Sequence, residues 1–507
     1  MANVILKSRN NYRVFGVSWD KGTSPTLTRT DAAKGLTANA GVDTGVVVNQ
    51  FDSLPIFGEI KTVTDSYGNV FRRIPKFYIG KSDGVGSKTW RVSKARHSGF
   101  YLPWCFWDFT NSKELPYVDV GKHKATSDGG TPKLESKPDL YPLCNQNIVT
   151  FRTYAEANNT GGLLGYQQLD IHAIDVLQTL MTIEFATLNM QTIMYGFGNG
   201  YYGAAHVALV ADTGVNAIVV TNAQGATYRV GQTISIHLAA QSATPYTLPN
   251  TYGRTITAIT ADTPAAGQTT ITFDGAAINI ALNDFVMNTG WKNGFSSAIA
   301  ASSGSLVSNS DGKYPCVYRG IESPYGDLWQ FVDGINVDGG STWVTATAYY
   351  EGDIVIGTTT TETYRCTADH TSDADKKPST GADWADYWEL YAHRQAWVCA
   401  DADDYASNVF AAPYEQLSYI NRNANNYVQS MGWDSDNPYA MFPTAVYASS
   451  SQYYCDYYYQ NTGARIARFS GHWGAGAAAG PWFWDMNVSA VSVNVFIGGR
   501  LVRKAVT

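Results

Sequence analysis

The C-terminal stretches YASSSQYYCDYYYQN (Tyr447–Asn461) and RFSGHWGAGAAAGPWFWDMNVSAVSVNVFIGGRLVR (Arg468–Arg503) decide the fold. The first contains YYCDYYY (Tyr453–Tyr459), a run of seven side chains that exceeds what the two faces of one strand normally bury. Several of these side chains should therefore be exposed. Exposed aromatic patches usually mark contact sites, so the run predicts a binding surface.

The composition supports a binding role. The 507 residues are enough for several domains, and only 16% of them are charged, against about 25% in an average soluble protein. The chain has 33 tyrosines, 14 tryptophans and 47 glycines. Tyrosine and tryptophan offer a large contact area at little rotamer cost, which favours them on binding surfaces. Filling of β-sheet cores is the alternative role for about half of these aromatics.

A set of short motifs carries a family resemblance. In the C-terminal part they are Gly471 and Trp473 in SGHW, Gly480, Trp482-Phe483, Ser489, Ser492 and Ile497-Gly-Gly-Arg500-Leu501. Earlier stretches add SPTLTRTDAA (Ser24–Ala33), DSYGNVFRRIPKFYI and the segment from Ile171 to Gln191. In this order they resemble the variable proteins of diversity-generating retroelements, which include phage tropism determinants. The similarity covers about 370 residues, with two interruptions.

The resemblance implies an α+β fold with a C-type-lectin-like core, similar to that of formylglycine-generating enzymes, and two inserted small β-domains. It also implies a phage tail receptor-binding protein, or adhesin, that recognises a bacterial surface glycan or protein through a hypervariable C-terminal surface. The expected partners are that receptor and other virion tail proteins, in a homotrimer. The expected location is the virion, after synthesis in the host cytoplasm.

The resemblance also implies which residues vary. In that family template adenines are randomised, mostly within AAC-type codons, and these codons can become Tyr, Asn, Asp, Cys or His but not Trp, Gln or Met. The candidate variable positions are thus Tyr453, Tyr454, Cys455, Asp456, Tyr457, Tyr458 and Tyr459, and the expected scaffold residues are Trp473, Trp482, Trp484 and Arg500. The predicted ligand-binding residues are Tyr447, Tyr453, Tyr454, Asp456, Tyr457, Tyr458, Tyr459, Asn461, His472, Asp485 and Asn487.

Composition shifts and periodicity suggest the domain organisation. Helical spacing predicts a helix over Ile171–Asn189 with Asp170 as its N-cap, a shorter helix over Phe151–Asn158, and a third over residues 411–432. The Asp65–Asn69 turn precedes a predicted strand over Val70–Gly80. The expected parts are an attachment or oligomerisation segment (1–44), a core (45–204 and 289–340), an inserted β-barrel or sandwich (205–288), a carbohydrate-module-like insertion (341–392) and the variable ligand-binding region (393–507).

The 341–392 insertion resembles small chitin-binding-type carbohydrate modules, which stack sugar rings on exposed aromatic side chains. The alternative is a structural β-module whose tryptophans form a miniature core, since so small a domain needs some of them inside. The possible carbohydrate platform consists of Trp343, Tyr349, Tyr364, Trp384 and Trp388.

Several function classes lack support. The net charge is −7 and no Lys/Arg block is present, so nucleic acid is not an expected partner. The six cysteines show no CxxC pairing, so we expect no metal, and no cofactor is implied. No run of 18 apolar residues predicts membrane insertion, and no signal peptide is visible.

We expect a protein that is not an enzyme. Formylglycine-generating enzymes use a close cysteine pair, whereas Cys399 and Cys455 stand 56 positions apart. The acidic cluster of Asp401, Asp403 and Asp404 fits a solvated turn or N-cap, with a calcium site as the alternative. A structural virion fibre or baseplate protein and a glycan-depolymerising enzyme, which needs two carboxylates across a cleft, are the rival functions.

Overall fold

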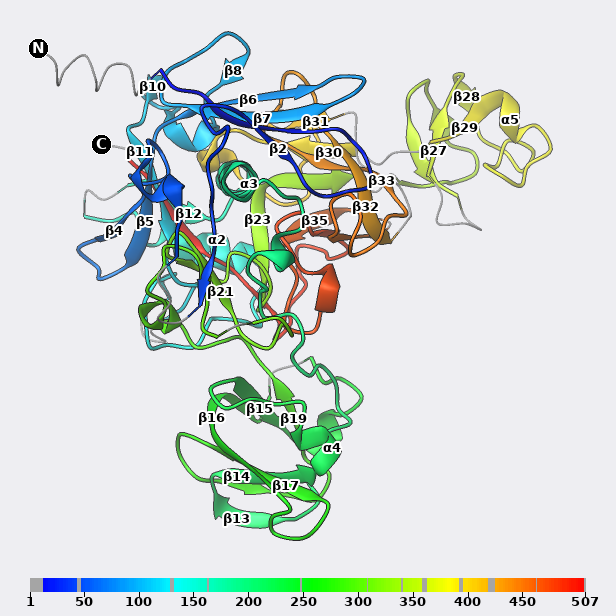
Figure 1. The fold of residues 1–507 in the computed structure, drawn as a ribbon. Helices are drawn as coiled ribbons and strands as arrows, with labels where there is room; N and C mark the ends of the chain where they lie inside the picture. The colour runs from blue at the N-terminus through cyan, green and yellow to red at the C-terminus, as the bar shows by residue number, and fades with distance from the viewer. Residues whose placement is uncertain are drawn as a thin grey trace, which may run out of the picture.

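The computed structural model describes residues 12–505 except 43–46, 128–131, 162–163, 247–248, 308, 339–340, 358–362, 392–394, 418–424 and 462. The structure is β-rich, with 35% strand and 12% helix. The proportion of residues in strands is thus higher than expected for an α+β fold. Figure 1 shows a central body from which two smaller β units project, one below it and one to the right. None of the helices described is long and apolar enough to cross a membrane.

The long helix α3 (Ile171–Phe185) occupies the centre of the body (Figure 1). Asp170 caps it by accepting a hydrogen bond from the Ala173 amide (2.8 Å), as predicted. The helix ends at Phe185, four residues before the predicted Asn189, and its C-cap Ala186 adopts a left-handed conformation. Every residue of α3 is buried. Its periodicity indicated one apolar face, but surrounding sheets cover the polar faces as well.

The first sheet against α3 has the order β2-β1-β7-β6-β8 and is antiparallel throughout. Phe15 and Trp19 of β1 belong to the main hydrophobic core. The predicted boundary at residue 44 is therefore wrong, because the described part of 1–44 contributes strands to the central body. The strands are β1 (Phe15–Trp19), β2 (Thr28–Asp31), β6 (Tyr78–Asp83), β7 (Lys88–Ser93) and β8 (Phe100–Tyr101).

The second sheet, β12-β38-β11-β5-β4, brings the C-terminal strand between two strands from the first third of the chain. The predicted Asp65–Asn69 turn is confirmed, but the predicted strand over Val70–Gly80 divides at Pro75 and continues in the first sheet as β6. The strands are β4 (Lys61–Thr64), β5 (Val70–Pro75), β11 (Tyr117–Gly121), β12 (Tyr166–Gln168) and β38 (Leu501–Lys504). Helix α2 (Ile148–Glu156), the predicted shorter helix, packs beside β12.

Arg500 holds this arrangement together from inside. The residue is only 1% exposed. Its guanidinium donates to Gln330 Oε1 (2.8 Å), to the Gly121 carbonyl (2.8 Å) and to the Glu322 carbonyl (2.7 Å). Three segments far apart in the sequence thus converge on one side chain, which fits the scaffold role predicted for it.

The third sheet has nine strands in the order β31-β30-β23-β35-β36-β34-β32-β33, with β37 beside β23. The predicted helix over residues 411–432 is wrong, because its described part forms β31 and β32, and β32 pairs with strands on both sides. Residues 418–424 of that prediction lie outside the described residues. The strands are β23 (Trp329–Asp338), β30 (Gln395–Val398), β31 (Glu415–Leu417), β32 (Asn426–Gly432), β33 (Phe442–Val446), β34 (Tyr457–Gln460), β35 (Arg465–Phe469), β36 (Trp484–Met486) and β37 (Ile497–Gly498).

Two minor sheets complete the body. Strand β3 (Gly41–Val42) runs parallel to β20 (Gly304–Ser305), which continues to β21 (Cys316–Tyr318) and β22 (Ile321–Glu322). Strands β9 (Trp107–Asp108) and β10 (Lys113–Glu114) form a separate pair. The β3–β20 pairing joins the predicted first segment to the core continuation, so these regions belong to one body.

The 205–288 insertion forms a β unit with its own hydrophobic cluster, which includes Ile218, Ile234 and Ile271. Strands dominate the described residues of this unit, as expected for an inserted β-barrel or sandwich. The five-stranded sheet has the order β14-β17-β16-β15-β19, and β13 pairs with β18. The elements are β13 (Asp212–Val215), β14 (Ala217–Thr221), α4 (Asn222–Gly225), β15 (Thr233–His237), β16 (Thr251–Ala261), β17 (Gln268–Phe273), β18 (Ile278–Ile280) and β19 (Phe285–Asn288).

The 341–392 insertion is also a separate β unit, and its aromatic side chains lie inside it. The predicted carbohydrate platform is wrong for Trp343, Tyr349, Tyr364 and Trp388, which are at most 8% exposed and form one cluster. Trp384 is half-buried and packs against the Tyr364 ring. A unit this small needs these rings as its core. The elements are β24 (Ser341–Thr342), β25 (Ala348–Tyr349), β26 (Ile354–Ile356), β27 (Thr363–Cys366), β28 (His370–Thr371), α5 (Trp384–Tyr387) and β29 (Trp388–Leu390).

The buried pair of Arg319 with Glu184 of α3 predicts a large mutational effect. The guanidinium donates to both carboxylate oxygens (2.8 and 2.7 Å), and the side chains are 4% and 0% exposed. Arg319→Met leaves the Glu184 charge without its cation, so we expect a loss of about 3–5 kcal/mol in the free energy of unfolding, measured in urea. The matched control is Arg365→Met in the exposed pair with Glu389, where about 0–1 kcal/mol is expected. Equal effects of the two substitutions would contradict this assignment.

Candidate ligand-binding site

The side chains of the tyrosine-rich run point alternately to the two faces of strand β34. Successive side chains of a strand point to opposite faces. Tyr458 is paired in register with Trp484 of β36, and both are fully buried in the main core. Tyr457 and Tyr459 project from the other face, where their rings lie 4.8 Å apart. Tyr459 is 37% exposed and Tyr457 is half-buried.

The prediction that the whole run contacts ligand is therefore wrong for its inward-facing members. Tyr454, Asp456 and Tyr458 are at most 1% exposed, as is the candidate variable residue Cys455. The ring of Tyr454 lies 5.4 Å from Trp19 and 5.4 Å from Trp482. These side chains fill the space between the third sheet and the N-terminal strands, which the local sequence could not reveal.

Asp456 has a structural role close to the motif residues. Its carboxylate accepts a hydrogen bond from the Trp482 amide (2.7 Å). A Cβ atom at Gly480 would lie 2.0 Å from Asp456 Oδ1, so only glycine lets the two segments approach this closely. Gly480 is one of the residues that carry the family resemblance, and this contact gives it a physical reason.

Four predicted site residues surround one cavity of about 410 Å³ beside the outer face of β34. They are Tyr459, His472, Asp485 and Asn487. The other lining side chains include Tyr202, Trp329, Arg468, Phe483 and Phe496. The volume lies within the range of small-molecule sites, and the lining combines aromatic rings with a few polar groups, as such sites usually do.

The polar end of the cavity is built by cross-strand neighbours. Asp485 is in register with Tyr459 on one side and with Arg468 on the other. The Arg468 guanidinium donates through Nη2 to Asp485 Oδ2 (2.9 Å), and Asp485 Oδ1 accepts from the Asn487 amide (2.9 Å). Asn487 Oδ1 in turn accepts from Asn461 Nδ2 (3.0 Å). Asp485 therefore holds Arg468, and it is itself only 1% exposed.

Arg468 keeps hydrogen-bond donors for a ligand. Among the described residues, Nη1 has no hydrogen-bond partner; Nε has none either, but it is buried and out of reach. The guanidinium carbon lies 4.7 Å from the centre of the Trp329 ring and 5.7 Å from that of Phe496. This stacking and the Asp485 bond fix the guanidinium and leave Nη1 as the donor toward the cavity.

The aromatic walls of the cavity remain uncharged. The His472 ring stacks on Phe496 (4.8 Å between centres) and meets Tyr202 edge-on (4.6 Å). Burial, together with the positive charge of Arg468, lowers the pKa of His472 to about 3. Burial, with the negative charge of Asp485, raises the pKa of Tyr459. At neutral pH the imidazole and the phenol are therefore both neutral.

The remaining predicted residues lie elsewhere. Tyr447 is 77% exposed but does not line the cavity. Tyr453 is half-buried against Trp19 (6.3 Å between ring centres) and lines a different groove with Lys81 and Trp433. The predicted scaffold residues Trp473, Trp482 and Trp484 are buried, as expected.

Sequence reasoning missed Arg468, Tyr202 and Trp329. Arg468 stands in the quoted C-terminal stretch, and its in-register position opposite Asp485 is a signal only once the strands are known. Tyr202 and Trp329 come from segments more than 120 residues earlier in the chain. No local pattern places them beside β34.

The acidic cluster behaves as a cap. Asp401 accepts a hydrogen bond from the Asp403 amide at the start of the 3-10 turn η6 (Ala402–Asp404), which confirms the N-cap interpretation. Within the described residues no group of three or more ligand-type side chains could hold a metal ion. Cys399 and Cys455 are buried free thiols, and burial raises their pKa values to about 11 and about 12. Neither thiol ionises at neutral pH.

Comparison with known proteins adds no family assignment: no protein-family model matches the chain, and no curated protein matches it significantly.

The buried Asp456 predicts a pH-dependent stability difference. Burial raises the pKa of this carboxyl well above its usual 3.8. The unfolded chain therefore releases the proton from about pH 4 upward while the folded chain retains it, so this group lowers stability as pH rises. Asp456→Asn removes the effect. Its stability advantage over the wild type in urea should grow above pH 4 by up to about 1.4 kcal/mol per pH unit. A pH-independent difference would contradict the burial of this carboxyl as a neutral acid.

Proposed function

We propose that the protein is a receptor-binding protein of a phage tail that meets a bacterial surface glycan through the outer face of β34 and the adjoining aromatic cavity. One observation carries the proposal: four residues selected from sequence as ligand-binding, namely Tyr459, His472, Asp485 and Asn487, line the same cavity although they stand on three segments. Residues that the family resemblance predicts to contact ligand therefore lie around one cavity.

The lining favours a saccharide over a flat protein surface. Aromatic rings present apolar faces to the C–H face of a sugar ring, and Arg468 offers its Nη1 donor to hydroxyl or carboxylate oxygens. Tyr457 and Tyr459 add hydroxyls on a rigid strand, which suits adaptable contacts at low entropic cost. Binding of a protein receptor instead would appear as cell adsorption without any glycan signal.

The C-type-lectin-like core and the retroelement relationship are part of this proposal. They are supported by the order of the motif residues and by the close approach that Gly480 permits. Within the candidate variable positions of Tyr453–Tyr459, those on the outer face of β34 are Tyr457 and Tyr459. A silent template repeat beside the gene should differ from it at adenines only and at codons for exposed residues. Mismatches at other bases would overturn the retroelement part.

We further propose that the chain functions as a homotrimer on the virion, where several copies reinforce weak single-site contacts. Light scattering after size-exclusion chromatography should give about three times the chain mass of 55.2 kDa. A monomer at micromolar concentration would contradict the trimer but not the binding site.

The binding site is tested by the double substitution Tyr457→Ala/Tyr459→Ala. Tyr459 is exposed, and Tyr457 is half-buried at the edge of the cluster around Phe483, where its hydroxyl donates to the Asn425 carbonyl (2.7 Å). The double substitution should therefore cost about 1 kcal/mol in the free energy of unfolding and leave the protein folded. Binding to a microbial glycan array, or adsorption to a panel of bacterial strains, should weaken about tenfold or more, as expected for loss of aromatic anchors. Tyr447→Ala is the matched control, because this tyrosine is exposed but lies outside the cavity.

Unchanged binding by the double variant would overturn the site and favour the alternative function of a structural fibre or baseplate protein.

A separate assay tests the alternative function of a glycan-depolymerising enzyme. Incubation with host cell-wall polysaccharide should produce no new reducing ends, and their appearance would favour a glycan-depolymerising enzyme.

A further inference from the structure

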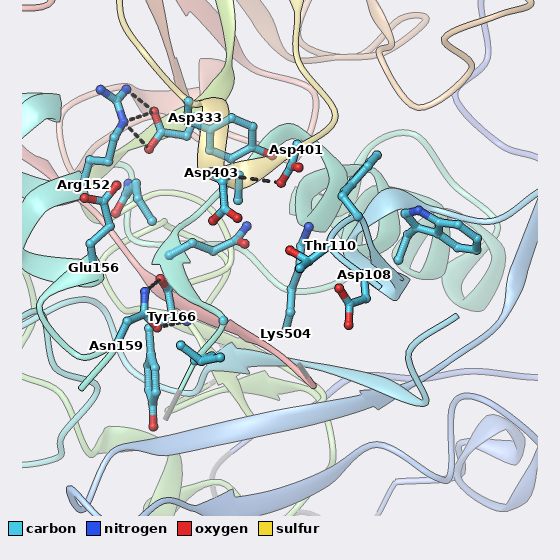
Figure 2. Close-up of a pocket in the computed structure, with 18 residues that line it drawn as sticks. Asp108, Thr110, Arg152, Glu156, Asn159, Tyr166, Asp333, Asp401, Asp403 and Lys504 are labelled. Carbon is cyan, nitrogen blue, oxygen red and sulfur yellow. Dashed lines mark hydrogen bonds and ion pairs between the residues drawn. The ribbon is translucent and has the colours of Figure 1, made fainter. Parts of the chain in front are cut away.

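A second cavity, of about 430 Å³, lies between the second sheet, helix α2 and the turn η6 (Figure 2). It shares no lining residue with the aromatic cavity beside β34. Its side chains come from β9 and the loop after it, from α2, β12, β23, η6 and β38. Six separate chain segments therefore contribute to one hollow that the proposed receptor site does not use.

Lys504 is the unusual residue of this cavity. The residue is 6% exposed, and Figure 2 shows its side chain extending into the hollow between Asp108 and Asp403. Its ammonium lies 5.6 Å from the centre of the Phe109 ring. Among the described residues it forms no hydrogen bond and no ion pair through that ammonium. The Nζ atom is not among the solvent-inaccessible polar atoms, so it opens to the cavity, where its charge acts on Asp403. A ligand in the cavity can therefore accept a hydrogen bond from this ammonium.

Some of the other charged groups in the cavity are paired within the protein, and others accept no hydrogen bond from a described residue. Arg152 and Asp333 neutralise each other, with Nη2 to Oδ1 at 2.5 Å. Asp401 caps η6. The carboxylates of Glu156 and Asp403, by contrast, accept no hydrogen bond from any described residue, and both face the hollow in Figure 2. Burial raises the pKa of each, and the charge of Asp403 contributes to the shift at Glu156.

The charges of the lining side chains determine which ligand charge the cavity can accept. An anion attracted to Lys504 would meet Glu156 and Asp403, with the further negative charges of Asp108 and Asp401 in the same lining, so an anion is strongly disfavoured. A cation attracted to Glu156 or Asp403 would meet the ammonium of Lys504. A neutral ligand with several hydroxyl groups avoids both conflicts, because hydroxyls donate to carboxylates and accept from an ammonium. The half-buried rings of Trp107 and Phe109 at one end of the cavity provide an apolar face for the same ligand.

We propose that the cavity around Lys504 is a second binding site, which takes a neutral sugar of one or two rings. Lys504 donates to a ring or hydroxyl oxygen, Asp403 and Glu156 accept from hydroxyls, and Trp107 or Phe109 covers the C–H face. The site is independent of the receptor site beside β34.

The test is saturation-transfer difference NMR on the full chain. The neutral probes are maltose, cellobiose, lactose and N,N′-diacetylchitobiose, and the charged probes are glucuronic acid and glucosamine. At least one neutral disaccharide should give signals with the wild type, and Asp403→Asn and Lys504→Met should each weaken its binding about tenfold. Asp403 is exposed, so Asp403→Asn remains informative if Lys504→Met fails to fold. Arg365→Ala, at an exposed residue of the 341–392 unit, is the neutral control.

Tyr459→Ala separates this proposal from the receptor site. If the signals survive Tyr459→Ala and disappear with Asp403→Asn, the second site is supported whatever the fate of the receptor site. Signals that disappear only with Tyr459→Ala would place the sugar beside β34 and overturn the second site. Binding of charged probes only, or of no neutral probe, would overturn it as well.

Discussion

The burial of α3 on all sides is the constraint on which the rest of the structure depends. A helix without an exposed face needs a partner for each of its charged side chains, since an unpaired buried charge costs several kcal/mol. Asp175 meets Lys81 of β6 and the Tyr101 hydroxyl, and Glu184 meets Arg319. Each of these partners comes from a different segment.

The same helix is connected to the proposed ligand-binding face. Gln178 donates to the Pro481 carbonyl (2.6 Å), directly before the segment that supplies Trp482 and Asp485. Trp482 in turn fixes Asp456 through its amide, and β36 fixes the register of β34. The outward tyrosines can change without disturbing this network, because their side chains are not part of it. That separation is what a surface with variable contacts on a stable scaffold requires.

Local sequence patterns predicted the elements that depend on neighbours in the chain. The spacing of α3 and its Asp170 cap, the Asp65–Asn69 turn and the β structure of the 205–288 unit are of this kind.

Local patterns failed for elements whose structure is determined by pairing with distant segments. The residues of β32 have spacing that also suits a helix, but strands on both sides complete their hydrogen bonds. The platform aromatics of the 341–392 unit are typical of sugar-binding modules, yet a unit of that size uses them as its core. Tyr454 and Tyr458 could not be separated from Tyr457 and Tyr459 until the register of β34 was known. Arg468 and Lys504 are single basic residues whose surroundings come from distant segments.

The central claim is that one face of the tyrosine-rich segment holds the fold and the other binds the target. Saturation mutagenesis of residues 452–461, scored separately for protease resistance and for adsorption to host cells, tests it most directly. We expect most substitutions at Tyr454, Asp456 and Tyr458 to lose protease resistance, with Asp456→Asn as the exception because it removes the buried ionisable group. Substitutions at Tyr457 and Tyr459 should keep protease resistance and lose adsorption. Loss of both properties together at all five positions, or of neither at Tyr457 and Tyr459, would contradict it.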